Sequence, residues 1–180
     1  MKIRDISKDF YITGTSFLLG AAVIDNHRYE GELVYAATFP VMVNLAFSIE
    51  SFLKALHCYS ANITPFKTHN LFDIFVKLPT NYKKDIVDNY LRYKTNTVDK
   101  KNIPNCMDDF LALLNKHKNA FESWRYAELH DSSNDGIFLY VLSYVLYKYS
   151  QKALKITDKY TKEIQVEVEK HPIFRSKWTK

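Results

Sequence analysis

Arg125 and His130 stand in a short polar segment between two long apolar stretches of the sequence. Arginine carries a permanent charge that can bind a phosphate group, and histidine can take or give a proton near neutral pH. Such a pair suits chemistry on the RNA backbone. Because five helical positions rotate a side chain by about 140°, the two residues meet only if the helix ends or bends, or if both face a shared cleft. The alternative is a solvated helix end with two ordinary polar residues.

Glu50 and His69 are the next candidates, as supporting residues. Glu50 interrupts an apolar run, and two interpretations stay open: an exposed ion pair with Lys54 one turn on, or a buried carboxylate that orients a cation such as Arg125. His69 precedes a short predicted helix, and we expect it to cap or brace that helix, with an active role as the alternative.

The elements that must position these residues are helices. The chain has 180 residues with four Gly and five Pro, and its apolar residues recur at helical spacing. We expect a single all-α domain over residues 1–180, a helical bundle of about five to seven helices. Its core would span about 33–150, and a basic C-terminal helix and tail would cover 151–180. The predicted helices lie at about 5–29, 33–61, 67–78, 81–93, 105–116 and 135–168.

Local signals predict where some helices start or bend. Pro40 lacks a backbone donor and should kink the second helix or reset its start. Thr68 is the expected cap of the third helix, and Asn105 that of a later one. Gly14 weakens the first helix or admits a close neighbour.

The basic excess lies at the C-terminal end. From Lys148 to Lys180 there are nine Lys or Arg against four acidic residues, whereas the preceding residues balance. This end could meet an RNA backbone or form an ordinary solvated surface.

Several classes of protein are disfavoured. Cys58 and Cys106 are far apart and no secretory signal precedes them, so we expect reduced thiols in a cytoplasmic protein. The histidines have no metal-ligand spacing, so we expect no metal and no other cofactor. The uncharged run 33–49 reaches only the lower limit for a membrane span and contains Pro40, so a core helix is predicted and no membrane association.

Three motifs follow one another along this helical pattern: residues 46–56 with Glu50 and Lys54, then Thr68-His69-Asn70-Leu71, then Arg125-x-x-x-x-His130. Their order and helical setting resemble the HEPN superfamily, named for nucleotide-binding domains of higher eukaryotes and prokaryotes. The resemblance covers roughly residues 33–150.

The resemblance implies a bundle that forms homodimers, with both Arg-His pairs facing one cleft. Many members are metal-independent endoribonucleases in toxin–antitoxin and phage-defence systems. Carried over, Arg125 and His130 would be the catalytic pair, RNA the substrate, and an antitoxin or other protein a possible partner. Attack by the ribose 2′-hydroxyl would then cut RNA and spare DNA.

Two departures keep alternatives open. Tyr126 follows the arginine where the family commonly has a polar residue, and Ser132 stands where members that are adenylylated carry Tyr. The Trp124-Arg125-Tyr126 run also resembles a HEPN branch in which some members have no such histidine, so an incidental His130 stays an alternative. The alternatives are therefore a non-catalytic HEPN module that binds RNA, nucleotide or a partner protein, and a purely structural helical interaction protein.

Overall fold

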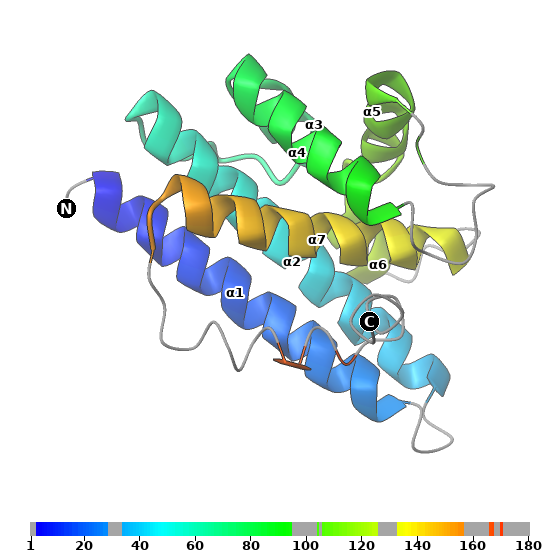
Figure 1. Cartoon of the computed structure of the whole chain (residues 1–180). Helices are drawn as coiled ribbons and strands as arrows, with labels where there is room; N and C mark the ends of the chain where they lie inside the picture. Colours follow the sequence, from blue (N-terminus) through cyan, green and yellow to red (C-terminus); the bar gives the residue numbers. More distant parts are fainter. Residues whose placement is uncertain are drawn as a thin grey trace.

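The computed structural model describes residues 3–28, 34–94, 104, 106–125, 133–156, 166–167 and 170. This part of the chain contains seven α-helices and no strand, which confirms the predicted all-α bundle (Figure 1). The helices are α1 (Ile3–Arg28), α2 (Val34–Ala61), α3 (Leu71–Val76), α4 (Thr80–Lys94), α5 (Met107–Lys116), α6 (Ala120–Arg125) and α7 (Ser133–Ala153).

Helices α1 and α2 run side by side and in opposite directions, and they approach closely at a glycine (Figure 1). A Cβ atom added at Gly14 would lie 2.9 Å from ring atoms of Phe52 on α2. At the same level Ser48 donates a hydrogen bond to the Gly14 carbonyl at 2.9 Å. Gly14 therefore allows the close approach that its position in the sequence suggested.

Helix α7 packs against α1, α2 and α4 and completes the centre of the bundle (Figure 1). The Ser143 hydroxyl on α7 lies 2.7 Å from the Ser48 hydroxyl, so two buried polar groups satisfy each other. From Phe138 to Tyr147 every residue of α7 is buried, which explains its uncharged sequence.

Phe110 on α5 joins the shorter helices to this centre. Its ring centroid lies 5.4 Å from Phe75 of α3, 5.3 Å from Tyr90 of α4 and 5.7 Å from Phe138 of α7. Such aromatic contacts bury large apolar areas, so α3, α4 and α5 share one core with α7.

Pro40 lies inside a continuous α2 and does not reset its start, contrary to one of the two expected outcomes. The Pro40 carbonyl accepts a hydrogen bond from the Asn44 side-chain amide at 2.9 Å. Residues on the following turns are buried against α1 and α7, so tertiary packing outweighs the proline's local preference.

The helix caps differ from those expected. Asn70, not Thr68, is the N-cap of α3, and its side chain accepts from the Asp73 backbone N–H at 3.0 Å. Cys106 occupies the N-cap of α5 without a side-chain cap hydrogen bond, and Asn105 lies outside the described residues.

Helix α7 ends at Ala153, so the predicted continuation to about residue 168 is wrong at this point. Lys155 adopts a positive φ of 54°, and the Ile156 N–H bonds to the Gln151 carbonyl at 3.1 Å. This pattern of a left-handed residue and a 6→1 hydrogen bond closes the helix as a Schellman motif. Most of the predicted basic segment beyond it lies outside the described residues.

One helical stretch in the described part of the chain, Thr38–Ala61, is long and apolar enough to cross a membrane. However, 72% of its most apolar window is buried inside the protein. The same burial is typical of a core helix, which is the interpretation that the sequence favoured.

Candidate functional site

A buried ion pair on α2 forms the base of the candidate site. Glu50 and Lys54 lie one helical turn apart, with 2.7 Å between Lys54 Nζ and Glu50 Oε1. Glu50 is 6% exposed and Lys54 is 7% exposed. The predicted pairing of the two residues is present, but the predicted exposure is wrong because the packed bundle encloses this face of α2.

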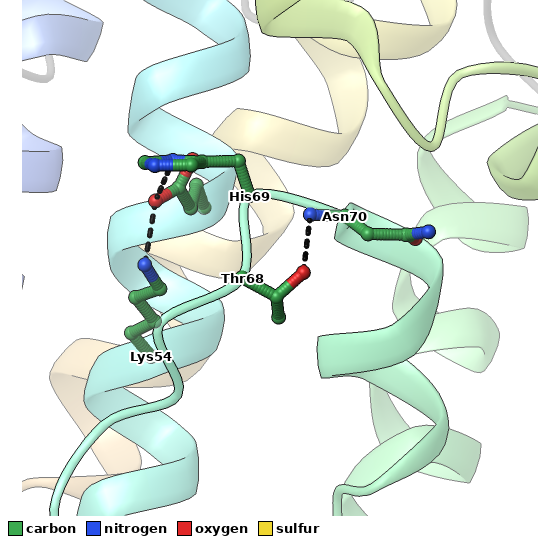
Figure 2. A network of polar contacts seen from close by, with 5 residues as sticks. Lys54, Thr68, His69 and Asn70 are labelled. Atoms are coloured by element: carbon green, nitrogen blue, oxygen red, sulfur yellow. Dashed lines mark hydrogen bonds and ion pairs between the residues drawn. The ribbon is translucent and has the colours of Figure 1, made fainter.

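His69 is the second partner of the same carboxylate. Its Nδ1 lies 3.0 Å from both Oε1 and Oε2 of Glu50. Glu50 forms an ion pair with the Lys54 ammonium, and the carboxylate of such a pair only accepts hydrogen bonds. Nδ1 therefore carries the hydrogen and donates it to Glu50. Figure 2 shows His69 and Lys54 approaching this carboxylate from different directions.

Hydrogen bonds on either side of His69 fix the segment that carries it. The Thr68 hydroxyl accepts from the Asn70 backbone N–H at 3.1 Å (Figure 2). The Leu71 N–H donates to the Lys118 carbonyl at 2.8 Å, which ties the start of α3 to the turn before α6. His69 thus braces the bundle through Glu50, while Asn70 does the capping.

The His69 side chain is partly exposed to solvent. The side chain is 55% exposed, and within the described part of the chain Nε2 has no hydrogen-bond partner. The His69 ring is therefore oriented by Glu50 at Nδ1 while much of the side chain is open to solvent.

Helix α6 lies beside this Glu50–Lys54–His69 cluster. Its first turn carries Phe121, whose ring centroid lies 4.2 Å from Phe47 of α2 and 6.0 Å from His69. Phe47 is one turn before Glu50 on α2, and Arg125 is one turn after Phe121 on α6. The backbone of Arg125 therefore lies about one helical turn, roughly 6 Å, along α6 from the residue that contacts the cluster.

The predicted Arg125–His130 pair is not tested by these contacts. His130 and the side chain of Arg125 lie outside the part of the chain that the structure describes. The two supporting residues, Glu50 and His69, are brought together. Glu50 is a buried carboxylate that orients other groups, and its described partners are Lys54 and His69.

Cys58 follows Lys54 by one turn on α2 but does not extend the reactive cluster. Burial raises the pKa of the Cys58 thiol, although Lys54 acts in the opposite direction. Since the thiolate is the nucleophilic form, this buried thiol is unreactive near neutral pH.

His57 also lies near this face of α2 and packs its ring 4.2 Å from Phe66. Burial, with a smaller contribution from the positive charge of Lys77, lowers the pKa of His57. His57 is 4% exposed, so it is a neutral core residue rather than a group that meets substrate.

A separate polar groove of about 320 Å³ lies between α4 and α7. It combines carboxylates from α4 with lysines from α7, and at its wall the Tyr149 hydroxyl donates to Asp85 Oδ2 at 3.2 Å. None of its lining residues belongs to the Glu50 cluster, so the groove is a different surface. Among the described residues no group of three or more His, Cys, Asp and Glu is placed to hold a metal ion.

The pairing of His69 with Glu50 is the feature that the sequence did not predict. The two residues are far apart in the chain, and the contact depends on how the segment before α3 folds back over α2. The available signal was the single acidic residue in an otherwise apolar helix, followed by a histidine at the next helix start.

No protein-family model matches the sequence, no curated protein matches it significantly, and no solved structure matches the chain.

Proposed function

We propose that this chain is a metal-independent endoribonuclease of the HEPN type, which cuts RNA with Arg125 and His130. The single observation that carries the proposal is the position of α6. Two of the three sequence motifs meet, since His69 contacts Glu50 beside Lys54, and α6, the helix that ends at Arg125, packs next to them through Phe121. Burial of a carboxylate and an ammonium is costly, and functional sites are one setting in which such a cluster is retained, which supports the proposal.

In the proposed mechanism the ribose 2′-oxygen attacks the adjacent phosphorus. The new 2′-O–P bond forms while the P–O5′ bond breaks, which leaves a 2′,3′-cyclic phosphate and a 5′-hydroxyl. Arg125 stabilises negative charge on the phosphoryl oxygens, and His130 serves as general acid or base. DNA is not cut because it lacks the attacking hydroxyl.

The proposed active form is a cytoplasmic homodimer in which both Arg125–His130 pairs face one cleft. The proposed setting is a toxin or phage-defence system, and an antitoxin is the expected protein partner. The basic excess toward the C-terminus supports attraction to the RNA backbone.

The test is cleavage of a mixed-sequence RNA by the full chain in the presence of a metal chelator. Arg125→Ala and His130→Ala are compared with wild type and with Arg92→Ala, a matched control on α4 at the separate groove. We expect each site variant to lose about 10²–10⁴-fold in rate, while the control keeps the wild-type rate.

Intact RNA after incubation with wild type, or equal cleavage by all four proteins, contradicts the proposal. RNA that is bound but not cut would identify the chain as the non-catalytic alternative, and loss of binding in Arg125→Ala would then assign the RNA contact to α6.

A further inference from the structure

The exposed side of α1 carries no charge over about four helical turns. Helix α1 lies at the edge of the bundle and packs its buried side on α2 and α7 (Figure 1). The 15 residues from Phe10 to Ile24 include no Asp, Glu, Lys or Arg, on the exposed side as well as on the buried one. A surface helix normally presents charged and polar side chains to solvent. An uncharged outer face of this length is typical of a surface that binds another protein.

The side chains on this face recur at the spacing of a helix–helix contact. We call Ile12, Ser16, Leu19 and Val23 the α1 seam. They follow one another at intervals of four, three and four residues, which places them in one row along the helix. Ile12 is 59% exposed and Val23 is 38% exposed, Ser16 is exposed, and Leu19 is half-buried. The row therefore has the pattern of a packed seam but lies on the exposed side of α1.

The two hydroxyl groups of this face are already hydrogen-bonded within α1. Thr13 donates to the Asp9 carbonyl at 2.8 Å, and Ser16 donates to the Ile12 carbonyl at 3.0 Å. A polar group that enters an interface is costly when its hydrogen bond is left unmade. Another helix can therefore cover this face without leaving a hydroxyl donor unpaired.

Charged residue types return at the two ends of the row, and they differ in sign. Asp5 and Asp9 continue the row toward the N-terminus, whereas His27 continues it toward the C-terminus, and all three are exposed. The exposed Lys8 lies about 100° round the helix from Asp9 and outside the row. In an antiparallel pair centred on Ser16, Asp5 of each chain lies level with His27 of the other. The row is thus complementary to a second copy of itself, whereas a parallel pair would bring the carboxylates together.

We propose that the α1 seam is the homodimer interface of this protein. Its occupant is the α1 seam of a second copy, in antiparallel orientation about a two-fold axis. This inference rests on the homodimer of the proposed function, to which it adds the contact surface. It uses none of the residues of the proposed catalytic pair.

Antiparallel pairing has a consequence for the position of α6. Phe17 lies about 100° round α1 from Ser16, and its ring stacks on Phe47 of α2 at 4.9 Å. Phe47 in turn lies 4.2 Å from Phe121 of α6. One flank of the seam therefore leads across α2 to α6. The two-fold axis of an antiparallel pair keeps this flank on the same side of the dimer in both chains, whereas a parallel pair would place the flanks on opposite sides. Antiparallel pairing agrees with a cleft that both chains share.

The double variant Ile12→Lys with Val23→Lys tests the interface. Both side chains are exposed and lysine is a good helix former, so the circular dichroism spectrum should match that of wild type. We expect the dimer dissociation constant from sedimentation over a concentration series to rise by about 10²–10³-fold, because the seam gains unpaired ammonium groups. Ile63→Lys with Val76→Lys is the matched control, since these two side chains are 43% and 36% exposed on other elements, and it should dimerise like wild type.

Disulfide cross-linking tests the orientation. Cys106→Ser first removes the exposed native thiol, and Cys58 is buried. An antiparallel pair centred on Ser16 places Asp9 of one chain opposite Val23 of the other, whereas Asp9 of the two chains are about 21 Å apart along the axis. A disulfide joins Cα atoms only about 4.4–6.8 Å apart. We expect oxidation to cross-link the double variant Asp9→Cys with Val23→Cys between chains, and to leave each single variant uncross-linked.

The failures of this inference and of the proposed function are distinguishable. A double lysine variant that dimerises like wild type overturns the α1 seam as the interface, and cross-linking of Asp9→Cys alone overturns the antiparallel orientation. A wild type that is monomeric at all concentrations overturns the inference together with the proposed homodimer. Metal-independent RNA cleavage by such a monomer would leave the proposed catalysis in place, whereas a seam-dependent dimer that cuts no RNA would overturn only the catalysis.

Discussion

Glu50 brings a negative charge into the interior of the bundle, and Lys54 is the cation that offsets it. Both side chains are nearly inaccessible, and their contact distance is 2.7 Å. A buried ion is costly when its partner is removed, whereas removal of both ions is much better tolerated.

Glu50→Gln should therefore lower the free energy of unfolding by about 3–5 kcal/mol, because the Lys54 ammonium loses its counter-charge. Adding Lys54→Met should recover most of this loss. Urea unfolding of the two single variants and the double variant checks the prediction. A Glu50→Gln protein as stable as wild type, or a double variant no more stable than Glu50→Gln, contradicts this account of the pair.

Burial of His57 lowers its pKa, which makes the stability of the protein depend on pH. Its ring is enclosed by Phe66, and within the described residues Nδ1 has no hydrogen-bond partner. Because burial lowers the folded-state pKa below the ordinary 6.5, the unfolded chain takes up a proton more readily than the folded chain. Stability should fall as the pH drops through 6.5 toward the lower folded-state pKa.

The expected contribution is at most about 1.4 kcal/mol per pH unit, the value for one proton. It is measured as the difference between wild type and His57→Phe in urea unfolding at a series of pH values from neutral to acidic. Wild type should lose stability relative to the variant on acidification. Parallel curves for the two proteins would show that His57 does not titrate as described.

At the scale of elements, two glycines on α1 give opposite predictions. A Cβ at Gly14 would press on the Phe52 ring at 2.9 Å, whereas a Cβ at Gly20 would meet its nearest atom, in the Asn44 side chain, at 3.9 Å. Gly14→Ala should cost about 1–3 kcal/mol through overpacking between α1 and α2. Gly20→Ala should stabilise by about 0.5–1 kcal/mol through helix propensity. Thermal unfolding of the two variants tests both predictions. Stability changes of the same sign in Gly14→Ala and Gly20→Ala would contradict this description of the α1–α2 contact.

The positions of two long helices could be predicted from the sequence, whereas a helix end and a helix cap could not. Helices α2 and α7 were predictable because their apolar residues recur over many turns, and the loss of charge along α7 matches its burial. The end of α7 was not predictable from the sequence. Helices commonly end at a glycine or asparagine with positive φ, whereas here that residue is Lys155. The Thr68 cap was misplaced by two residues because Thr68 and Asn70 are both capping types.

The candidate site was predictable in its residue types and not in its pairing. A lone acidic residue with a lysine one turn later marked Glu50 and Lys54, yet an exposed and a buried pair have the same spacing. The contact between Glu50 and His69 arises from tertiary packing, since Leu71 and Lys118 fix the segment over α2. No local pattern encodes such a contact.

At the scale of the whole molecule, the bundle consists of a buried centre of long helices and shorter helices packed on it. Helices α1, α2 and α7 supply the buried centre, and Phe110 ties the shorter helices to it. The Glu50–Lys54–His69 cluster lies on the buried middle part of α2, the helix that also contacts α6. Glu50 and Lys54 belong to helix α2, and His69 lies in the segment before α3 that the Leu71–Lys118 hydrogen bond holds in place.

The proposed homodimer makes a prediction for the whole molecule. If the cleft forms between two chains, the cleavage rate per chain should fall on dilution as the mass determined by sedimentation shifts from dimer to monomer. A chain that sediments as a monomer at all concentrations and keeps a constant rate per chain would contradict the dimer.

The central proposal is that RNA is cut through its own 2′-hydroxyl by Arg125 and His130. The most direct measurement uses an RNA whose cleavage position has been mapped, beside the same RNA with a single 2′-deoxy nucleotide on the 5′ side of that bond. The account predicts a 2′,3′-cyclic phosphate product from the first RNA and no cleavage at that bond in the second, with equal binding of both. Cleavage of the 2′-deoxy substrate at the same bond and rate would contradict it.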